Sequence, residues 1–169
     1  MTVQNEVTWL IDVMQTNWPG VEFPPSLALR NRDEPLTIYP NGDTVREEGV
    51  SLDAYYTASL THGATTRAFY GNRPQYDTTT TVDVQVEAKA DEAFGEADDI
   101  DAFRTLVAYV QDAINTQITY PAVDTGDDDT GRVTYLDLRI ADTDHRSREF
   151  TDQYRTDFTV ELRGREETP

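Results

Sequence analysis

The sequence contains no cysteine, and Lys89 is the single lysine among its 14 Lys and Arg residues. Without cysteine the chain forms no disulfide, no thiolate zinc site and no cysteine nucleophile. Long apolar runs are also missing, since no segment approaches the about 20 apolar residues that a membrane-spanning helix needs. The first basic side chain is Arg30, so the charged start of a secretory signal is absent too. These absences predict a soluble protein that is made in the cytoplasm.

Positive charge is scarce relative to negative charge. The 169 residues include 14 Lys and Arg against 32 Asp and Glu, which gives a formal net charge of -18. An acid-rich, lysine-poor composition is typical of proteins from extreme halophiles, whose surfaces stay hydrated at molar salt. The alternatives are an ordinary acidic protein or a partly disordered one. A field of this sign repels nucleic acid, and no aromatic-interleaved basic stripe is present, so specific binding to DNA is not expected.

The sequence lacks the common signatures of catalysis. It has no phosphate-binding Gly-x-x-x-x-Gly-Lys loop, no Gly-x-Gly-x-x-Gly, no Gly-x-Ser-x-Gly elbow and no His-Glu-x-x-His. The acidic residues of 124–129 lack the spacing of a calcium loop. A metal site can be drawn from Asp142, Asp144 and His145, yet solvated surface carboxylates are the simpler interpretation. We therefore expect no enzymatic activity, no cofactor and no metal.

A strand and a helix occupy the central stretch from Thr78 to Ile118. The first half alternates apolar and polar residues. It predicts a half-buried strand whose apolar face consists of Val82, Val84, Val86, Ala88 and Ala90. The second half repeats apolar residues at intervals of three and four. It predicts an amphipathic helix whose buried stripe consists of Ile100, Phe103, Leu106, Val107, Val110, Ala113 and Ile114. The two apolar faces can bury each other, so we expect this pair to form the core.

The segments before this pair predict a further helix and further strands. Apolar residues from Val3 to Trp18 recur with a helical period, with Thr2 as a candidate N-cap. An extended connection over 21–35 and a short strand over 36–39 follow. A long strand is predicted over 52–61, and a turn at 62–64 separates it from a further strand over 67–70.

Two strands are predicted to close the chain. The first covers 133–141, with Leu136, Leu138 and Ile140 facing inward, and the second covers 154–162. The charged segment 142–153 between them is too long for a tight turn, which predicts a long loop or hairpin arm. The order of elements predicts a single α+β domain over 1–169, with two helices packed on one face of a mostly antiparallel sheet.

The charge is unevenly divided along the chain. Residues 1–144 hold 9 basic and 26 acidic side chains, whereas residues 145–165 hold five arginines and four acidic side chains. An arginine-bearing arm that meets an acidic neighbouring copy is one interpretation, because Arg binds carboxylates with two parallel hydrogen bonds. Pairing of the same arginines with carboxylates inside one chain is the other. Trp9 lies off the helical stripe, which makes it either an interface residue or a side chain that a later loop covers.

The order of these elements resembles the tail terminator (tail completion) proteins of tailed viruses, here of a haloarchaeal virus. The resemblance is carried by the N-terminal helix, the Tyr/Arg-rich segment Tyr70–Tyr76, the strand that feeds an amphipathic helix, and the closing strand Tyr154–Leu162. It implies a structural virion protein, without enzymatic activity, that forms a hexameric ring. Such a ring caps the tail tube and joins it to the head–tail connector protein. DNA passes through its channel without specific binding.

The predicted edges and loops indicate which surfaces of such a ring meet other subunits or the tail and neck. The candidate interface residues are Trp9, Arg67, Tyr70, Arg73, Tyr76, Arg146, Arg148 and Arg155. The acids of 92–98 and 124–129 are candidates for the channel lining. Another neck or minor tail protein is an alternative, and a non-viral halophilic domain that binds a small molecule or acts as an enzyme is a further one.

Overall fold

The computed structural model describes residues 2–3, 5–19, 27–33, 37–40, 45–46, 56–69, 75–89, 99–124, 132–146 and 153–167. The helices in these residues are α1 (Glu6–Thr16) and α2 (Asp99–Asn115). The strands are β1 (Thr2–Val3), β2 (Leu27–Asn31), β3 (Thr37–Pro40), β4 (Val45–Arg46), β5 (Tyr56–Phe69), β6 (Gln75–Lys89), β7 (Ala122–Asp124), β8 (Arg132–His145) and β9 (Gln153–Glu167).

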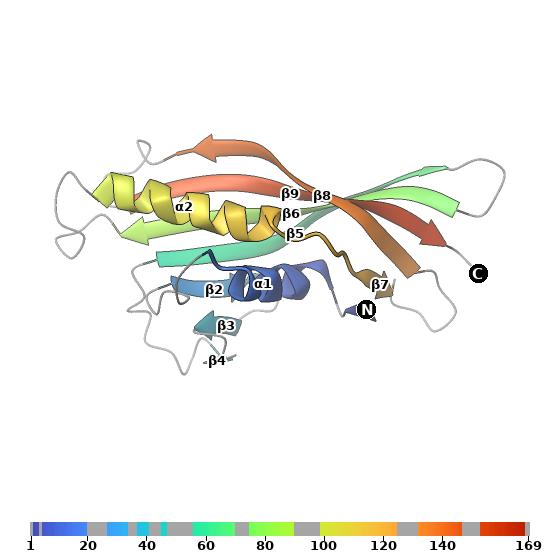
Figure 1. The fold of residues 1–169 in the computed structure, drawn as a ribbon, viewed down its shortest axis with the longest axis horizontal. Coiled ribbons are helices and arrows are strands. Elements are labelled where there is room, and N and C mark those ends of the chain that lie inside the picture. Colours follow the sequence, from blue (N-terminus) through green and yellow to red (C-terminus); the bar gives the residue numbers. More distant parts are fainter. Residues whose placement is uncertain are drawn as a thin grey trace.

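These nine described strands form one sheet in the order β1-β7-β8-β9-β6-β5-β2-β3-β4 (Figure 1). Most neighbours are antiparallel, while β1 pairs in parallel with β7 and β2 in parallel with β5. The predicted α+β class with a mostly antiparallel sheet is therefore confirmed. The four long strands β5, β6, β8 and β9 extend past both helices at the right-hand end of Figure 1.

The centre of the sheet is the ladder between β6 and β9. Its 15 residue pairs run without a bulge from Gln75 opposite Glu167 to Lys89 opposite Gln153. Residues directly opposite each other lie on the same face, so one face of both strands is buried together. On β6 the buried set includes Val82, Val84, Val86 and Ala88, as the alternation predicts, and Ala90 lies outside the described residues.

Helix α2 buries the predicted stripe from Phe103 onward, and the side chain of Ile100, the first predicted member, is not among those described. The buried residues are Phe103, Leu106, Val107, Val110, Ala113 and Ile114. The ring of Phe103 stacks on Tyr154 of β9, with ring centroids 5.6 Å apart. All but Ala113 belong to one hydrophobic cluster with buried residues of α1, β5, β6, β8 and β9. The strand and the helix of the central stretch thus contribute to one core, as expected.

Helix α1 begins later than the sequence pattern indicates. The Asn5 side chain accepts a hydrogen bond from the backbone N–H of Thr8 at 2.8 Å, so Asn5 is the N-cap and Glu6 the first helical residue. The predicted cap at Thr2 is wrong, because Thr2 and Val3 pair in parallel with β7 instead. Asn is among the best N-caps, and its extended backbone conformation is the one that an N-cap adopts.

The C-terminal end of α1 contacts the end of α2. The Asn17 side-chain amide donates to the Ala113 carbonyl at 3.3 Å and to Gln117 Oε1 at 2.7 Å. Trp18 meets the ring of Tyr109 edge to face, with centroids 6.0 Å apart. These contacts join segments almost 100 residues apart in the chain.

Strand β5 continues through the predicted turn at 62–64. The pairing register with β6 shifts between His62 and Thr65, so Gly63 and Ala64 form a bulge. The hydroxyl of Thr81 replaces the missing ladder bonds by accepting from the Ala64 N–H at 2.9 Å. Glycine in a strand often marks a bulge, so the turn prediction was wrong because β6 continues alongside and supplies partners.

A second bulge corrects the predicted face of β8. The register with β9 shifts between Tyr135 and Asp137, which makes Leu136 the extra residue. Leu136 is therefore 59% exposed, and Tyr135 takes the inward position that Leu136 was expected to fill. Leu138 and Ile140 lie after the bulge and pack against the core as predicted. One extra residue in a strand moves the following side chains to the other face. The prediction assumed an unbroken alternation and therefore placed Leu136 on the wrong face.

The segment predicted as a long loop or arm begins as strand. Strand β8 continues to His145, which pairs with Thr156, after another register shift between Ala141 and Asp144. Asp142 has a positive φ of 55° at this shift. Residues 147–152 lie outside the described residues. The predicted connection 21–35 contains β2, and the predicted loop after Pro121 begins with β7.

Gly164 provides a test of the β8–β9 packing. It lies opposite Tyr135, and a Cβ there would be 2.2 Å from the Thr134 carbonyl oxygen and 2.8 Å from Tyr135 Cα. Because these are backbone atoms, the clash requires the two strands to move apart. We expect Gly164→Ala to lower the free energy of unfolding by about 1–3 kcal/mol in urea titrations. Arg163→Ala, at the exposed neighbouring position, should lower it by about 1 kcal/mol or less, because this variant loses only the cross-strand pair with Asp137. Equal stabilities of the two variants would contradict this strand packing.

Candidate functional site

The face of the sheet opposite the core carries charged residues in register. Three arginines of β9 lie directly opposite a carboxylate on a neighbouring strand: Arg155 opposite Glu87, Arg163 opposite Asp137 and Arg165 opposite Asp77. Cross-strand pairs of opposite charge contribute about 0.2–1 kcal/mol each. We call this surface the open face, formed by the outward residues of β5, β6, β8 and β9.

The pair Arg139 and Glu161 shows how charges on the open face are held. Arg139 on β8 donates from Nε to Glu161 Oε2 at 2.5 Å. This hydrogen bond holds the pKa of Glu161 below its usual range and raises the pKa of Arg139. The stabilisation by Glu161 is therefore present above its ordinary pKa and is lost as the pH falls through the lowered one. The Arg139 side chain is half exposed, so water screens the pair.

A cluster of two arginines on one aspartate lies where β8 and β9 approach their hairpin connection. Arg155 donates from Nε to Asp157 Oδ1 and from Nη2 to Oδ2, both at 3.0 Å. Arg146 donates from Nη1 to the same Oδ2 at 3.3 Å. The hydrogen bonds that Arg155 donates to Asp157 raise the pKa of Arg155. Pairing inside one chain, the second of the two sequence interpretations, therefore describes both arginines.

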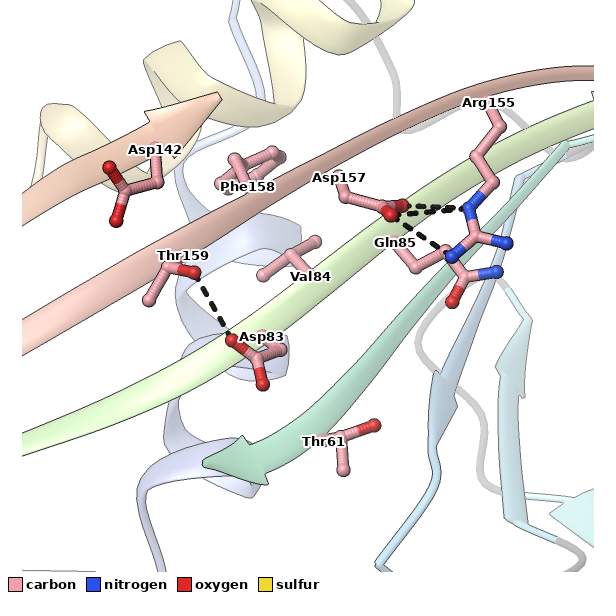
Figure 2. A pocket seen from close by; sticks show the side chains of 9 residues that line it. All are labelled: Thr61, Asp83, Val84, Gln85, Asp142, Arg155, Asp157, Phe158 and Thr159. Atoms are coloured by element: carbon pink, nitrogen blue, oxygen red, sulfur yellow. Dashed lines mark hydrogen bonds and ion pairs between the residues drawn. The ribbon is translucent and has the colours of Figure 1, made fainter. Parts of the chain in front are cut away.

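A polar groove of about 370 Å³ opens beside this cluster on the open face (Figure 2). Its lining consists of Thr61, Asp83, Val84, Gln85, Asp142, Arg155, Asp157, Phe158 and Thr159. The Thr159 hydroxyl donates to Asp83 Oδ1 at 3.1 Å across the groove floor (Figure 2). None of the lining residues is a serine, cysteine, lysine or histidine. In the described part of the chain, no three His, Cys, Asp or Glu residues are grouped to hold a metal ion.

The predicted metal ligands are engaged separately. His145 Nδ1 is 3.1 Å from the Thr156 hydroxyl, and Asp142 lines the groove. Asp144 is exposed and lies opposite Asp157 in the ladder. The three residues therefore do not converge on one point.

A buried polar network joins α1 to the sheet, and the sequence pattern did not reveal it. The Tyr135 hydroxyl donates to Glu6 Oε1 at 2.5 Å and lies 2.9 Å from the Thr80 hydroxyl. Glu6 is 7% exposed, and its second oxygen is 3.4 Å from His62 Nε2. Burial and the adjacent Glu6 raise the pKa of Tyr135. The Glu6 carboxylate of α1 thus contacts β5 and β8, and β6 joins the network through the Tyr135 hydroxyl.

A second buried carboxylate lies further along the same face. Glu166 on β9 accepts from Arg67 Nε on β5 and from the Thr78 hydroxyl on β6, the latter at 3.4 Å. Glu166 is buried, whereas the Arg67 side chain is half exposed. Arg67 therefore neutralises a carboxylate of its own chain while part of its side chain reaches solvent.

The structure separates the candidate interface residues into groups. Trp9 is 8% exposed and belongs to the core, so it is covered within the chain. Arg67 and Tyr76 lie toward the Gln75 end of β6, while Arg146 and Arg155 lie toward its Lys89 end. Tyr70, Arg73 and Arg148 lie outside the described residues. No single surface therefore collects the predicted set within the part that the structure describes.

The sequence also contains a long segment without acidic residues, which the prediction of the candidate interface did not take into account. No Asp or Glu occurs between Asp53 and Asp77, although the chain has 32 acidic residues. This acid-free segment contains all of β5 and the beginning of β6. Its basic residues are Arg67 and Arg73. The spacing between successive acidic residues reveals this segment. The net charge of residues 1–144 hides it, because these residues are strongly acidic as a whole.

The buried network predicts the effect of removing one hydroxyl. Tyr135→Phe leaves Glu6 without its closest donor, so we expect the free energy of unfolding at pH 7 to fall by about 1–3 kcal/mol. Tyr109→Phe removes a hydroxyl from an exposed ring and is the matched control. Chemical denaturation measures both. A Tyr135→Phe protein as stable as the control would contradict a hydrogen bond that matters to folding.

The raised pKa of Tyr135 also predicts an alkaline response. The unfolded chain releases this proton near the ordinary value of 10, whereas the folded protein retains it. The unfolded state therefore binds fewer protons above pH 10, and stability falls as the pH rises. We expect the decline in unfolding free energy between pH 9 and 11 to be shallower in Tyr135→Phe than in the unmodified chain and in Tyr109→Phe. Identical slopes would contradict the shift.

No protein-family model matches the sequence, and a search of curated proteins finds no matching relative. No helix in the described residues is long and apolar enough to cross a membrane.

Proposed function

We propose that the protein is a structural virion protein resembling tail terminators, which forms a hexameric ring. The ring caps the tail tube, joins it to the head–tail connector protein and belongs to the neck of a haloarchaeal virus particle assembled in the host cytoplasm. Its role is structural rather than enzymatic. The proposal rests on the order of elements together with one structural observation, the long sheet that leaves a charged face open.

The open face supports this proposal by its size and its chemistry. Four neighbouring strands of 14 or 15 residues, β5, β6, β8 and β9, contribute to it. In the proposed ring both helices pack on the opposite face, so the open face remains available to neighbouring proteins. Arginines and carboxylates alternate across its ladders, which keeps the surface hydrated and resistant to nonspecific adhesion.

The net charge fits a channel protein that does not retain DNA. Each DNA phosphate that a basic side chain neutralises strengthens the salt-dependent binding of a protein to the duplex. Arg139, Arg146 and Arg155 are already bound to carboxylates of the same chain. A formal charge of -18 per subunit repels the phosphate backbone, so DNA slides through the ring without specific binding.

Assembly mass tests the proposed ring. We expect sedimentation in 1 M KCl, alone or with the tail-tube protein, to give a particle of about six times the 19.1 kDa of one chain. Negative-stain images should show a closed ring at the end of the tube. A protein that remains monomeric under both conditions and never joins a tail particle would rule out this function.

The acidic surface predicts that stability rises with salt. The Debye length falls from about 10 Å at 0.1 M salt to about 3 Å at 1 M, which screens the repulsion among acidic side chains. We expect the melting temperature to rise steeply between these KCl concentrations. The double variant Asp12→Asn/Asp112→Asn removes two exposed charges and should show a smaller rise. A melting temperature independent of salt would show that self-repulsion does not limit stability.

A further inference from the structure

Among the described strands, β5 has no partner on one of its edges at the end beyond the helices. Strand β2 pairs with Tyr56 to Leu60, and the next residues of the chain after β2 extend the contact to His62. From Gly63 to Phe69, no described strand pairs with the side of β5 that faces away from β6. Residues 64–68 are exposed. We call 63–69 the β5 edge.

On the opposite side of the same sheet, a second edge has no partner among the described strands. Strand β7 pairs with β8 only from Arg132 to Thr134, and the Tyr135 N–H donates to the Pro121 carbonyl at 3.0 Å. Beyond that point, residues 136–145 have β9 as their one partner strand within the described part of the chain. We call 136–145 the β8 edge.

Unpaired edges present rows of backbone N–H and C=O groups that favour the addition of another strand. Proteins usually blunt such edges with charges, proline or bulges. The β8 edge carries three aspartates and bulges at both ends of its regular run from Asp137 to Ala141. The β5 edge carries one charged side chain, Arg67, and its regular run from Thr65 to Phe69 is rich in threonine. It is the less protected of the two.

The charges of the two edges decide which pairing between copies is favoured. The β5 edge has no acidic residue, and its one charged side chain, Arg67, is paired with Glu166 of the same chain. The β8 edge has a formal charge of -2, from three aspartates and Arg139. Two β8 edges would bring like charges together, whereas the β5 edge presents no acidic side chain to a β8 edge. Pairing of two β5 edges would close a dimer and could not continue into the proposed ring.

We propose that the β5 edge of one copy pairs with the β8 edge of the next, so that the sheet continues from subunit to subunit. The inference deepens the proposed ring and rests on it for closure. Because two different edges meet, the contact is head-to-tail, which produces a ring when the rotation closes and a filament when it does not. The partner is therefore a second copy of this chain.

The two edges fit each other in length and in the orientation of their faces. Each regular run has five residues, 65–69 on β5 and 137–141 on β8. Arg67 lies opposite Thr78, and Leu138 opposite Leu162, so both belong to the face that also carries the core. Thr66 and Asp137 belong to the open face, since they lie opposite Thr79 and Arg163. A continuous sheet therefore places Thr66 and Asp137 on the same side of the contact.

Site-directed cross-linking tests the pairing directly, because the natural chain has no cysteine. A Thr66→Cys protein carrying an affinity tag is mixed with an untagged Asp137→Cys protein in 1 M KCl. A thiol reagent spanning about 8 Å, the reach of diagonal cross-strand neighbours, is then added. We expect products containing one tagged and one untagged chain. Asp83→Cys replaces an exposed residue of β6 away from both edges and is the matched control in each mixture.

The cross-linked products distinguish the alternatives. Tagged–tagged products alone would indicate pairing of two β5 edges, and untagged–untagged products alone would indicate pairing of two β8 edges. Either result overturns the proposal, and so does a mixed yield no greater than that of the Asp83→Cys control. Circular dichroism of each variant establishes that the proteins are folded.

A charge substitution provides a second, independent measurement. Thr66→Glu places a negative charge on the β5 edge, whereas Thr105→Glu places the same charge on the exposed side of α2. We expect Thr66→Glu to weaken self-association about two- to fivefold per contact, as a like charge across a strand pair does. Thr105→Glu should leave it unchanged. Equal effects of both variants would show that net charge, and not the edge, controls association.

The outcomes separate this inference from the proposed function. A hexamer that gives no mixed cross-link retains the ring and overturns the edge pairing. A mixed cross-link in an open filament, or in an assembly that never joins a tail, retains the edge pairing and overturns the proposed ring.

Discussion

The β6–β9 ladder is the constraint on which the rest of the structure depends. Because its 15 pairs run without a bulge, every second side chain of both strands points to the same face along the whole length. One face supplies Val82, Val84 and Val86 to the hydrophobic core that also contains residues of α1 and α2. The other face carries the arginines and carboxylates of the open face. A shift of this ladder by one residue would exchange the two sets, burying charges and exposing the core.

Two buried carboxylates mark the region where the apolar core ends. Toward the Gln75 end of β6, threonines replace valines on the inward face, with Thr78 and Thr80 both buried. There Glu6 meets Tyr135, and Glu166 meets Arg67. A buried charge without partners is costly, so each carboxylate requires donors from neighbouring elements. These contacts fix the start of α1 and the far part of β5 in place with hydrogen bonds where apolar packing is no longer available.

The distribution of charge connects the fold to the proposed role. The arginines of β8 and β9 are used within the chain, opposite carboxylates of neighbouring strands. They therefore neutralise the open face locally, while the chain as a whole keeps its charge of -18. Against that background, the acid-free β5 is the segment that another acidic copy can approach. A strongly acidic subunit that forms rings needs such a segment, because like charges otherwise keep the copies apart.

The sequence by itself determined the class of the fold and the faces of its longest elements. The alternation of β6 and the helical period of α2 are strong signals because each repeats over several turns or residue pairs, and Val82 to Ala88 and Phe103 to Ile114 are buried as predicted. The tertiary structure alone decided the bulges at Gly63 and Leu136, since a bulge depends on hydrogen bonds to a neighbouring strand that lies far away in the chain. It also decided the short strands β1, β2, β4 and β7, which are too brief to show a period. The sequence pattern also gave no sign of the partners of Glu6 and Arg67, because the fold brings together residues that lie about 100 positions apart in the chain.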